Sequence, residues 1–206
     1  MKRSPLLVLF LCFLLLAVGC ANLTAGAKTS PTIDGIKKRG SIIVGTAANM
    51  PPLNMTTKKG VPAGLDIDIA QYIASAMGVQ LQLVTKNFDE LLPALEAGQV
   101  DMVISGMTIT PERNLKVAFA GPYHITGKAF LTKNAALAKA KDLAAFGLIT
   151  LITPFTYEPL GIALPAGDDH MLNWTTNFIN TLAASGELTN LKLKWIEKTN
   201  WIDELP

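Results

Sequence analysis

The order of apolar and amphipathic segments between residues 42 and 105 constrains the fold more than any other feature of this chain. Three short apolar runs alternate there with two longer segments in which apolar residues recur at helical spacing. In chain order these five segments are 42–46, 65–77, 81–84, 88–98 and 101–105. The last run is apolar enough for a strand that is buried on both faces. The alternation predicts an α/β fold with a mostly parallel sheet flanked by helices.

The longer of these two helices carries two acidic residues near its start. Leu65, Ile69 and Ile73 form its apolar stripe, and Asp66 is a natural N-cap. Asp66 and Asp68 could instead hold a metal ion, but no third ligand lies near them in sequence. Helix capping is therefore the favoured interpretation of Asp66.

The rest of the chain continues with short strands and helices. A short helix at 32–39 precedes the first strand, and two helices, at 168–184 and from 187 onward, finish the chain. Between them we expect strands at 128–133 and 161–164, an alanine-rich helix at 135–145 and an apolar run at 147–152. The residues expected to be buried on the last two helices are Met171, Trp174, Phe178, Leu182, Leu188, Leu191 and Trp195.

The segment 105–113, Ser-Gly-Met-Thr-Ile-Thr-Pro-Glu-Arg, has the chemistry of an anion site. It places small residues and hydroxyls at a strand end and an arginine on the helical turn that follows. Backbone N–H groups, hydroxyls and a guanidinium fork are what a small carboxylate needs in order to be held. The alternative is that Arg113 is a surface helix residue paired with Glu112 or Asp101.

The N-terminus has the features of an export signal. Lys2 and Arg3 precede an apolar run from residue 6 to 18 that is too short to span a bilayer, and Cys20 follows. Residues 16–20, Leu-Ala-Val-Gly-Cys, are similar to a bacterial lipobox. We therefore expect residues 1–20 to be a signal peptide with lipidated Cys20, and 21–31 to be a flexible tether. An ordinary cleaved signal with an incidental Cys20 is the alternative.

The charge composition of the chain limits which classes of partner it can bind. The chain has 18 basic and 16 acidic residues, so loss of Lys2 and Arg3 with the signal leaves 16 of each. A neutral chain without a basic run predicts no nucleic-acid partner. We also find no phosphate loop, nucleophile elbow or zinc pattern, so we expect no cofactor, no metal and no catalytic residue.

The motif order resembles the family 3 extracellular solute-binding proteins, the amino-acid receptors of ABC importers. The matching segments are 43–46, 63–68, 92–98, 100–113, 119–123, 158–164 and 186–195. The resemblance implies the type II periplasmic-binding fold, in which two α/β lobes close on a ligand. It also implies ABC permease subunits as partners, and a periplasmic or extracytoplasmic location with a lipid anchor in the membrane.

The resemblance also implies ligand-binding residues. Arg113 takes the α-carboxylate of the amino acid in a bidentate pair, and Thr108 adds a hydroxyl and a backbone N–H. Ser105 and Gly106 offer backbone groups. Two further positions, Phe88 and Met50, fall where the family places side-chain packing residues.

Compared with the family that it resembles, this chain is expected to lack most of the second lobe. About 70 residues that the family carries between the segments 135–146 and 147–152 have no counterpart here. We expect lobe 1 to comprise 32–133 and 153–206, with 134–152 a remnant of lobe 2. A ligand held by one lobe stays exposed to water, so we expect millimolar binding or weaker, about −4 kcal/mol.

Two alternatives to an amino-acid receptor use the same scaffold. One is a sensor or interaction module that uses the lobe as a docking surface. The other is an enzyme similar to periplasmic cyclohexadienyl dehydratase, which needs a general acid in a closed pocket. With lobe 2 missing, this enzyme is the less favoured alternative.

Overall fold

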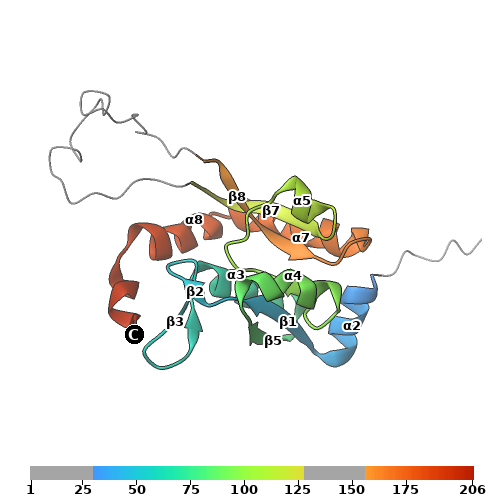
Figure 1. The fold of residues 1–206 in the computed structure, drawn as a ribbon, viewed down its shortest axis with the longest axis horizontal. Coiled ribbons are helices and arrows are strands. Elements are labelled where there is room, and N and C mark those ends of the chain that lie inside the picture. Colours follow the sequence, from blue (N-terminus) through green and yellow to red (C-terminus); the bar gives the residue numbers. More distant parts are fainter. Residues whose placement is uncertain (1–29, 128–155) are drawn as a thin grey trace, which may run out of the picture.

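The computed structural model describes residues 30–127 and 156–206 (Figure 1). In chain order the elements are α2 (Pro31–Arg39), β1 (Ser41–Thr46), β2 (Asn49–Met50), β3 (Asn54–Thr56), β4 (Pro62–Ala63), α3 (Leu65–Met77), β5 (Gln80–Thr85), α4 (Phe88–Glu96), β6 (Met102–Val103), α5 (Pro111–Asn114), β7 (Ala118–Thr126), β8 (Glu158–Leu164), α7 (Asp169–Ala184), α8 (Glu187–Lys192), the π-helix η2 (Leu193–Glu197) and the 3₁₀-helix η3 (Asn200–Glu204).

The parallel half of the main sheet is built as the sequence predicts. The sheet has the strand order β5-β1-β6-β8-β7, and β1 pairs in parallel with β5 and with β6. The connections through α3 and α4 are the βαβ crossovers that parallel neighbours require. Gly40 and Gly78, both at positive φ, end the helices before β1 and β5.

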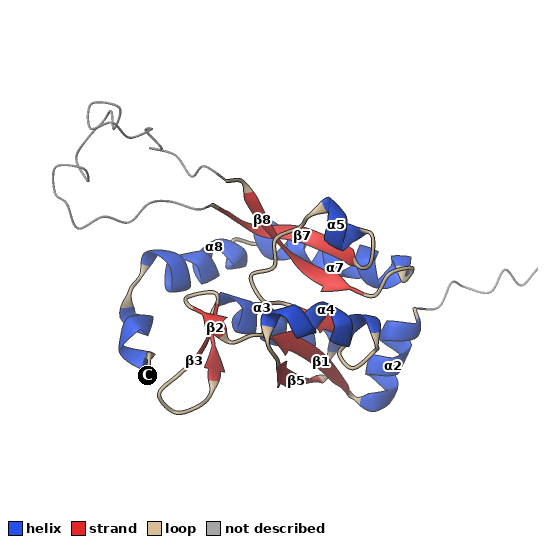
Figure 2. Ribbon diagram, in the orientation of Figure 1, coloured by secondary structure: helices blue, strands red, loops and turns tan. Residues whose placement is uncertain are grey.

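The two faces of β1 belong to different apolar clusters. Ile42 and Val44 pack with residues of α3, α7 and α8, whereas Ile43 packs with residues of α4. Successive side chains of a strand point to opposite faces, so a strand buried on both faces needs an almost continuous apolar run. Helices therefore cover both faces of the sheet (Figure 2).

The second half of the sheet is antiparallel, which makes the whole sheet mixed rather than mostly parallel. β8 runs antiparallel to both β6 and β7. The pairing of β7 with β8 extends to Thr126 and Glu158, so the chain leaves and re-enters the described part at adjacent positions (Figure 1). β7 was not predicted, because Gly121 and Pro122 interrupt its alternation. A register shift between Ala120 and His124 accommodates this interruption.

The C-terminal helices close the apolar core on the α3 side. Of the seven residues predicted to be buried there, five are buried, whereas Trp174 and Phe178 are only partly buried. Their rings stack at 5.6 Å between centroids, at the edge of the core. The buried positions are Thr175 and Ile179, each one residue after a ring, so this part of the inward face of α7 lies one residue further along than predicted.

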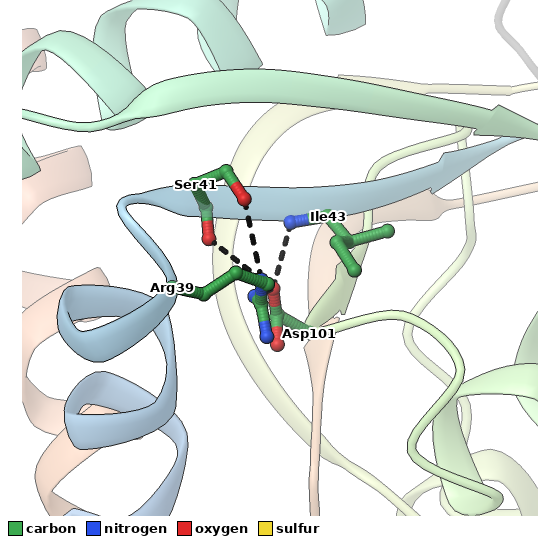
Figure 3. A network of polar contacts seen from close by, with 4 residues as sticks. All are labelled: Arg39, Ser41, Ile43 and Asp101. Atoms are coloured by element: carbon green, nitrogen blue, oxygen red, sulfur yellow. Dashed lines mark hydrogen bonds and ion pairs between the residues drawn. The ribbon is translucent and has the colours of Figure 1, made fainter.

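The amino end of β1 is fixed by a polar network that involves Asp101. The Asp101 carboxylate accepts a hydrogen bond from the Ile43 amide at 2.7 Å and forms an ion pair with Arg39 (Figure 3). Arg39 also donates to the Ser41 carbonyl at 3.1 Å. Asp101 is therefore the partner of Arg39 and not of Arg113.

Several sequence predictions fall on residues outside the described part. These are the signal peptide with Cys20, the tether up to residue 29, the strand at 128–133, the helix at 135–145 and the run at 147–152. In the described part, no helix combines the length and hydropathy that a membrane crossing needs.

Candidate functional site

The candidate site lies at the carboxyl ends of β1 and β6. β1 lies between β5 and β6, so the order of the parallel strands reverses at this point of the sheet. Ligands of open α/β sheets bind at such a switch point, outside the carboxyl ends of the strands. We use the name cradle for the surface formed here by Met50, Phe88, Gly106, Thr108 and Arg113.

Arg113 is held on the cradle by contacts with three residues, Thr110, Thr108 and Phe88. The hydroxyl of Thr110 caps α5 and accepts a hydrogen bond from the Arg113 amide at 3.3 Å. The Arg113 guanidinium donates through Nη1 to the Thr108 carbonyl at 2.8 Å and lies 5.5 Å from the centre of the Phe88 ring. The side chain is half-buried, neither extended into solvent nor covered by helices.

Most of the hydrogen-bonding capacity of Arg113 remains unused. A guanidinium carries five N–H donors, and the Thr108 carbonyl takes one of them. Within the described ranges, neither Glu112 nor any other carboxylate forms an ion pair with Arg113. The remaining donors can therefore bind a carboxylate from outside, and the pairing with Asp101 or Glu112 that the sequence allowed does not occur.

The backbone N–H and carbonyl groups of Thr108 point towards the cradle. It forms an isolated antiparallel bridge with Leu160, in which the Ile109 amide bonds the Pro159 carbonyl at 2.8 Å. The partner bond, between the Gly161 amide and the Met107 carbonyl, is 3.0 Å long. In this type of bridge the N–H and carbonyl of the central residue point away from the neighbouring strand. Of the residues described, none accepts a hydrogen bond from the Thr108 amide.

Ser105 lies below the cradle and not on its surface. The residue is completely buried, and its hydroxyl accepts a hydrogen bond from the Ala47 amide at 2.9 Å. This bond ties the end of β1 to the end of β6. Ser105 therefore supports the cradle, and in this conformation it offers no exposed group to a ligand.

Gly106 and Met50 form one wall of the cradle in close contact. Gly106 is buried and has a φ of +57°, and a Cβ atom there would lie 2.9 Å from the Met50 sulfur. It would also lie 3.0 Å from a methyl group of Leu53. Only glycine allows this approach without strain. Met50 itself remains 40% exposed, so its side chain is accessible to a ligand.

Asp66 is not the N-cap of α3 as predicted. Gly64 occupies the cap position with a φ of +134°, and no side chain caps this helix. Asp66 is two residues further along, the second residue of α3, and is completely buried on the same face as Ala70 and Ile73. A carboxylate on the buried stripe of a helix was the signal in the sequence, because a buried acid needs tertiary hydrogen-bond donors.

The donors to Asp66 come from two segments that are distant from it in sequence and that the fold brings next to it. The Tyr123 hydroxyl donates to Oδ1 at 2.7 Å, and the Asn54 amide donates to Oδ2 at 2.7 Å. Burial raises the pKa of Asp66 to about 6, and these two bonds and the Gly106 backbone oppose that rise. Burial beside this carboxylate also raises the pKa of Tyr123 well above its ordinary value, so its hydroxyl remains a donor.

The chemistry of the cradle is that of anion binding. Its groups are a permanently charged guanidinium, a backbone amide, an aromatic ring and a thioether. Across the described residues, no cluster of three or more histidine, cysteine or acidic side chains could hold a metal ion.

Comparison with known proteins adds a family and several relatives. Residues 42–198 match the family model of the bacterial extracellular solute-binding proteins, family 3. The L-arginine-binding protein of Pseudomonas aeruginosa is 39% identical over 93 residues, which are 45% of this chain and 36% of the relative. The arginine-binding extracellular protein ArtP of Bacillus subtilis is 30% identical over 144 residues, 69% of this chain and 53% of the relative. The chain thus spans about half, or less, of the length of these curated relatives.

A solved structure matches at the level of one domain. It is the arginine-bound form of domain 1 from TmArgBP, 33% identical to this chain, with a TM-score of 0.56. The match covers 72% of this chain and 98% of that one. The part of the chain that is similar therefore corresponds to almost the whole of a single domain.

Proposed function

Because the chain belongs to the bacterial extracellular solute-binding proteins of family 3, we propose that its cradle binds the α-carboxylate of a free amino acid. In this proposal the protein is the substrate-binding component of an ABC import system and works outside the cytoplasmic membrane. The observation that carries the proposal is the Arg113 guanidinium, which is fixed by the Thr108 carbonyl and Phe88 and has no carboxylate partner in the described ranges.

The geometry supports a two-point contact with a carboxylate. Arg113 offers unused N–H donors, and the amide of Thr108, whose carbonyl orients that guanidinium, is also unused. Charge-assisted hydrogen bonds of this kind contribute about 1.5–3 kcal/mol each. Phe88 and Met50 provide apolar contact beside them, so a small zwitterion with a side chain matches the cradle.

Arginine is the first ligand to test, because two relatives and one similar structure are named for it. The Phe88 ring already contacts one guanidinium, and a second cation could use the remaining ring surface. The ligand carboxylate and the cradle attract each other across an open surface, so the interaction is weaker than in a closed cleft.

A binding protein is favoured over an enzyme by the groups on the cradle. A phenyl ring and a thioether transfer no protons, and guanidinium groups do not act as proton donors in proteins. The dehydratase alternative needs a general acid, and Asp66, which the Gly106 main chain faces, is completely buried with both oxygens hydrogen-bonded.

For the domain organisation, we retain the division into lobe 1 (32–133 and 153–206) and a remnant of lobe 2 (134–152). Support comes from β7 and β8, whose pairing at Thr126 and Glu158 brings both ends of the intervening segment to one place. The arginine-bound form of domain 1 from TmArgBP is a precedent for a single domain with a ligand. Lobe 1 alone can therefore carry a cradle, with the millimolar affinity expected for a ligand open to water on one side.

For the location, we propose that Cys20 is lipidated and anchors the protein to a bacterial membrane. The family description, extracellular, agrees with export. Metabolic labelling with a palmitate analogue should label the wild-type protein in bacteria and leave Cys20→Ser unlabelled. Labelling that persists in Cys20→Ser would exclude this anchor.

The binding proposal is tested by nuclear magnetic resonance titration of the purified protein with L-arginine. We expect saturable shifts at the Thr108 and Arg113 amides with a Kd of about 1 mM. Arg113→Gln should weaken binding at least about tenfold, because it removes the charge-assisted bonds. Lys116→Gln, which removes a charge from the same loop, is the matched control and should bind as the wild type does. Equal affinities of Arg113→Gln and Lys116→Gln would reject the cradle as the carboxylate site.

A further inference from the structure

Asp66 lies beneath the cradle, at a point where three segments of the chain come together. Its carboxylate is completely buried and accepts hydrogen bonds from β3 through Asn54 and from β7 through Tyr123. The main chain of Gly106, which follows β6, also faces this carboxylate. We infer that Asp66 is the positioning residue of the ligand cradle, and that its ionised carboxylate holds the cradle wall in the ligand-binding geometry.

One connection from Asp66 leads directly to Met50. The Asn54 side chain donates to Asp66 and also accepts, through Oδ1, a hydrogen bond from the Asn49 amide at 3.3 Å. Met50 and Asn54 are opposite each other in the pairing of β2 with β3. A displacement of the Asn54 side chain would therefore shift the strand that carries Met50.

A second connection leads to Gly106 and from there to Thr108. Gly106 packs so closely on Met50 that an added Cβ would lie 2.9 Å from the sulfur, so the two sides of the wall cannot move independently. The Gly106 backbone near Asp66 fixes the turn at the point where the chain enters the segment 107–113. The orientation of the Thr108 amide, two residues on, depends on that turn.

The third connection holds β7. The Tyr123 hydroxyl is 2.7 Å from Asp66 Oδ1, and Tyr123 is only 1% exposed. Asp66 thus joins β7, the strand that leads out to residue 127, to the parallel half of the sheet. Removal of the carboxylate would leave two buried side-chain donors without their acceptor, which is a costly arrangement.

Ionisation of Asp66 decides whether these donors are all satisfied. A carboxylate only accepts hydrogen bonds, whereas a protonated acid carries an O–H donor that conflicts with one of the donors already present. The groups that face Asp66 are the Tyr123 phenol, the Asn54 amide and the Gly106 main chain, none of which carries a charge. The other acid of α3, Asp68, has its own partners in Lys194 and Trp195, both at 2.7 Å. With a pKa of about 6, the proton binds Asp66 in an accessible pH range.

The inference rests on the proposed function, and its test therefore includes a readout that needs no ligand. Asp66→Asn is compared with Asp68→Asn, which makes the same chemical change on the same helix at a partly exposed position. The readouts are L-arginine affinity at about pH 5 and pH 7 and amide hydrogen exchange of residues 49–54 and 106–108 in the free protein. The carboxylate and ammonium groups of arginine keep their charges between these pH values.

We expect wild-type affinity for L-arginine to fall about fivefold or more from pH 7 to pH 5. Asp66→Asn should bind about tenfold more weakly at pH 7 without this pH dependence, and exchange at 49–54 and 106–108 should be about tenfold faster. Asp68→Asn should match the wild type in all three readouts. Wild-type exchange and affinity in Asp66→Asn would overturn the inference.

The remaining outcomes separate this inference from the proposed function. If wild-type protein binds no L-arginine or other amino acid, the proposed function fails, and the exchange rates alone decide whether Asp66 positions the cradle. If Asp66→Asn does not fold, Tyr123→Phe replaces it, because it removes one donor and keeps the carboxylate. We then expect faster exchange at 106–108 and about threefold weaker binding; unchanged values of both would overturn the inference.

Discussion

At the scale of single residues, two side chains with opposite charges and opposite exposure define the site. Arg113 is half-buried and keeps most of its donors free, whereas Asp66 is completely buried and fully hydrogen-bonded. In the proposed binding mode, a ligand on the cradle would contact Arg113 directly and would be linked to Asp66 only through the Gly106 turn and the strand of Met50. This separation prevents the two charges from neutralising each other, which leaves Arg113 available for a ligand.

The buried carboxylate makes the stability of the protein depend on pH. Burial raises the pKa of Asp66 from 3.8 to about 6 in the folded state. A raised pKa means that the folded protein binds the proton more tightly, so its stabilising contribution is complete below about pH 4 and is lost as pH rises through 6. From pH 7 to pH 5, this group alone should raise the free energy of unfolding by about 1 kcal/mol.

Urea denaturation at pH 5 and pH 7 measures this effect. Asp66→Asn should lack the gain that the wild type shows at pH 5, and Asp68→Asn should keep it. A gain of the same size in Asp66→Asn would assign the pH dependence to another group.

The limits of sequence-based prediction are clearest at Asp66. Its position early in a helix favours capping on local grounds, and the donors that explain its burial, Asn54 and Tyr123, lie 12 and 57 residues away. The motif and the family resemblance point to Arg113 and Phe88, which do lie together in the structure, whereas their role in ligand binding stays a prediction. Ser105 could be located at a strand end, but its burial depends on the approach of Ala47 from another strand.

At the scale of the elements, local signals determined what could be predicted. α2, α3 and α4 are bounded by glycines or by a capping box, so their predicted limits agree with the structure within about two residues. β6 is reduced to two residues, since only those two pair with β1 in the register of the sheet. The small sheet of β2, β3 and β4 has no periodic signal in strands of two or three residues, and it was missed.

Substitution by alanine at two glycines, Gly35 and Gly64, should change the free energy of unfolding in opposite directions. Gly35 lies inside α2 with no atom within 4 Å of an added Cβ, so Gly35→Ala should stabilise the protein by about 0.5–1 kcal/mol through helix propensity. At Gly64, before α3, a Cβ would lie 2.3 Å from the Leu53 carbonyl oxygen, and the φ of +134° excludes other residues without strain. Gly64→Ala should therefore destabilise by more than about 3 kcal/mol.

Thermal and urea denaturation of both variants provide the measurement. Gly60→Ala serves as a control for Gly64→Ala, because it also has a positive φ, of +74°, but has open space around the added Cβ. It isolates the cost of the backbone conformation, about 1 kcal/mol. If Gly64→Ala is no worse than Gly60→Ala, the close approach of the segment 52–53 to the start of α3 is not rigid in solution.

At the scale of the whole molecule, the main five-stranded sheet of the described residues carries helices on both faces. The antiparallel strands β7 and β8 complete this sheet and also carry the chain out of it at Thr126 and back at Glu158. Both apolar clusters of the sheet involve residues from before and after the intervening segment, so the sheet is built from two distant parts of the sequence. The sequence alone predicts the parallel half of such a fold, since the crossovers are local, and not the antiparallel pairing of strands so far apart.

This arrangement predicts that residues 128–155 can be replaced by a short connection. Thr126 and Glu158 pair directly, so an Asn-Gly dipeptide between Gly127 and Thr156 would close β7 and β8 into a hairpin with a five-residue loop. Shortening the connection between Thr126 and Glu158 from 31 residues (127–157) to five lowers the entropy cost of closing the chain by about 1.6 kcal/mol, which predicts an equal or higher melting temperature. L-Arginine affinity should stay within about twofold of the wild type, because every cradle residue lies in 50–113. Calorimetric melting and titration measure both quantities. A tenfold loss of affinity with an unchanged melting temperature would instead assign part of the ligand site to the remnant of lobe 2.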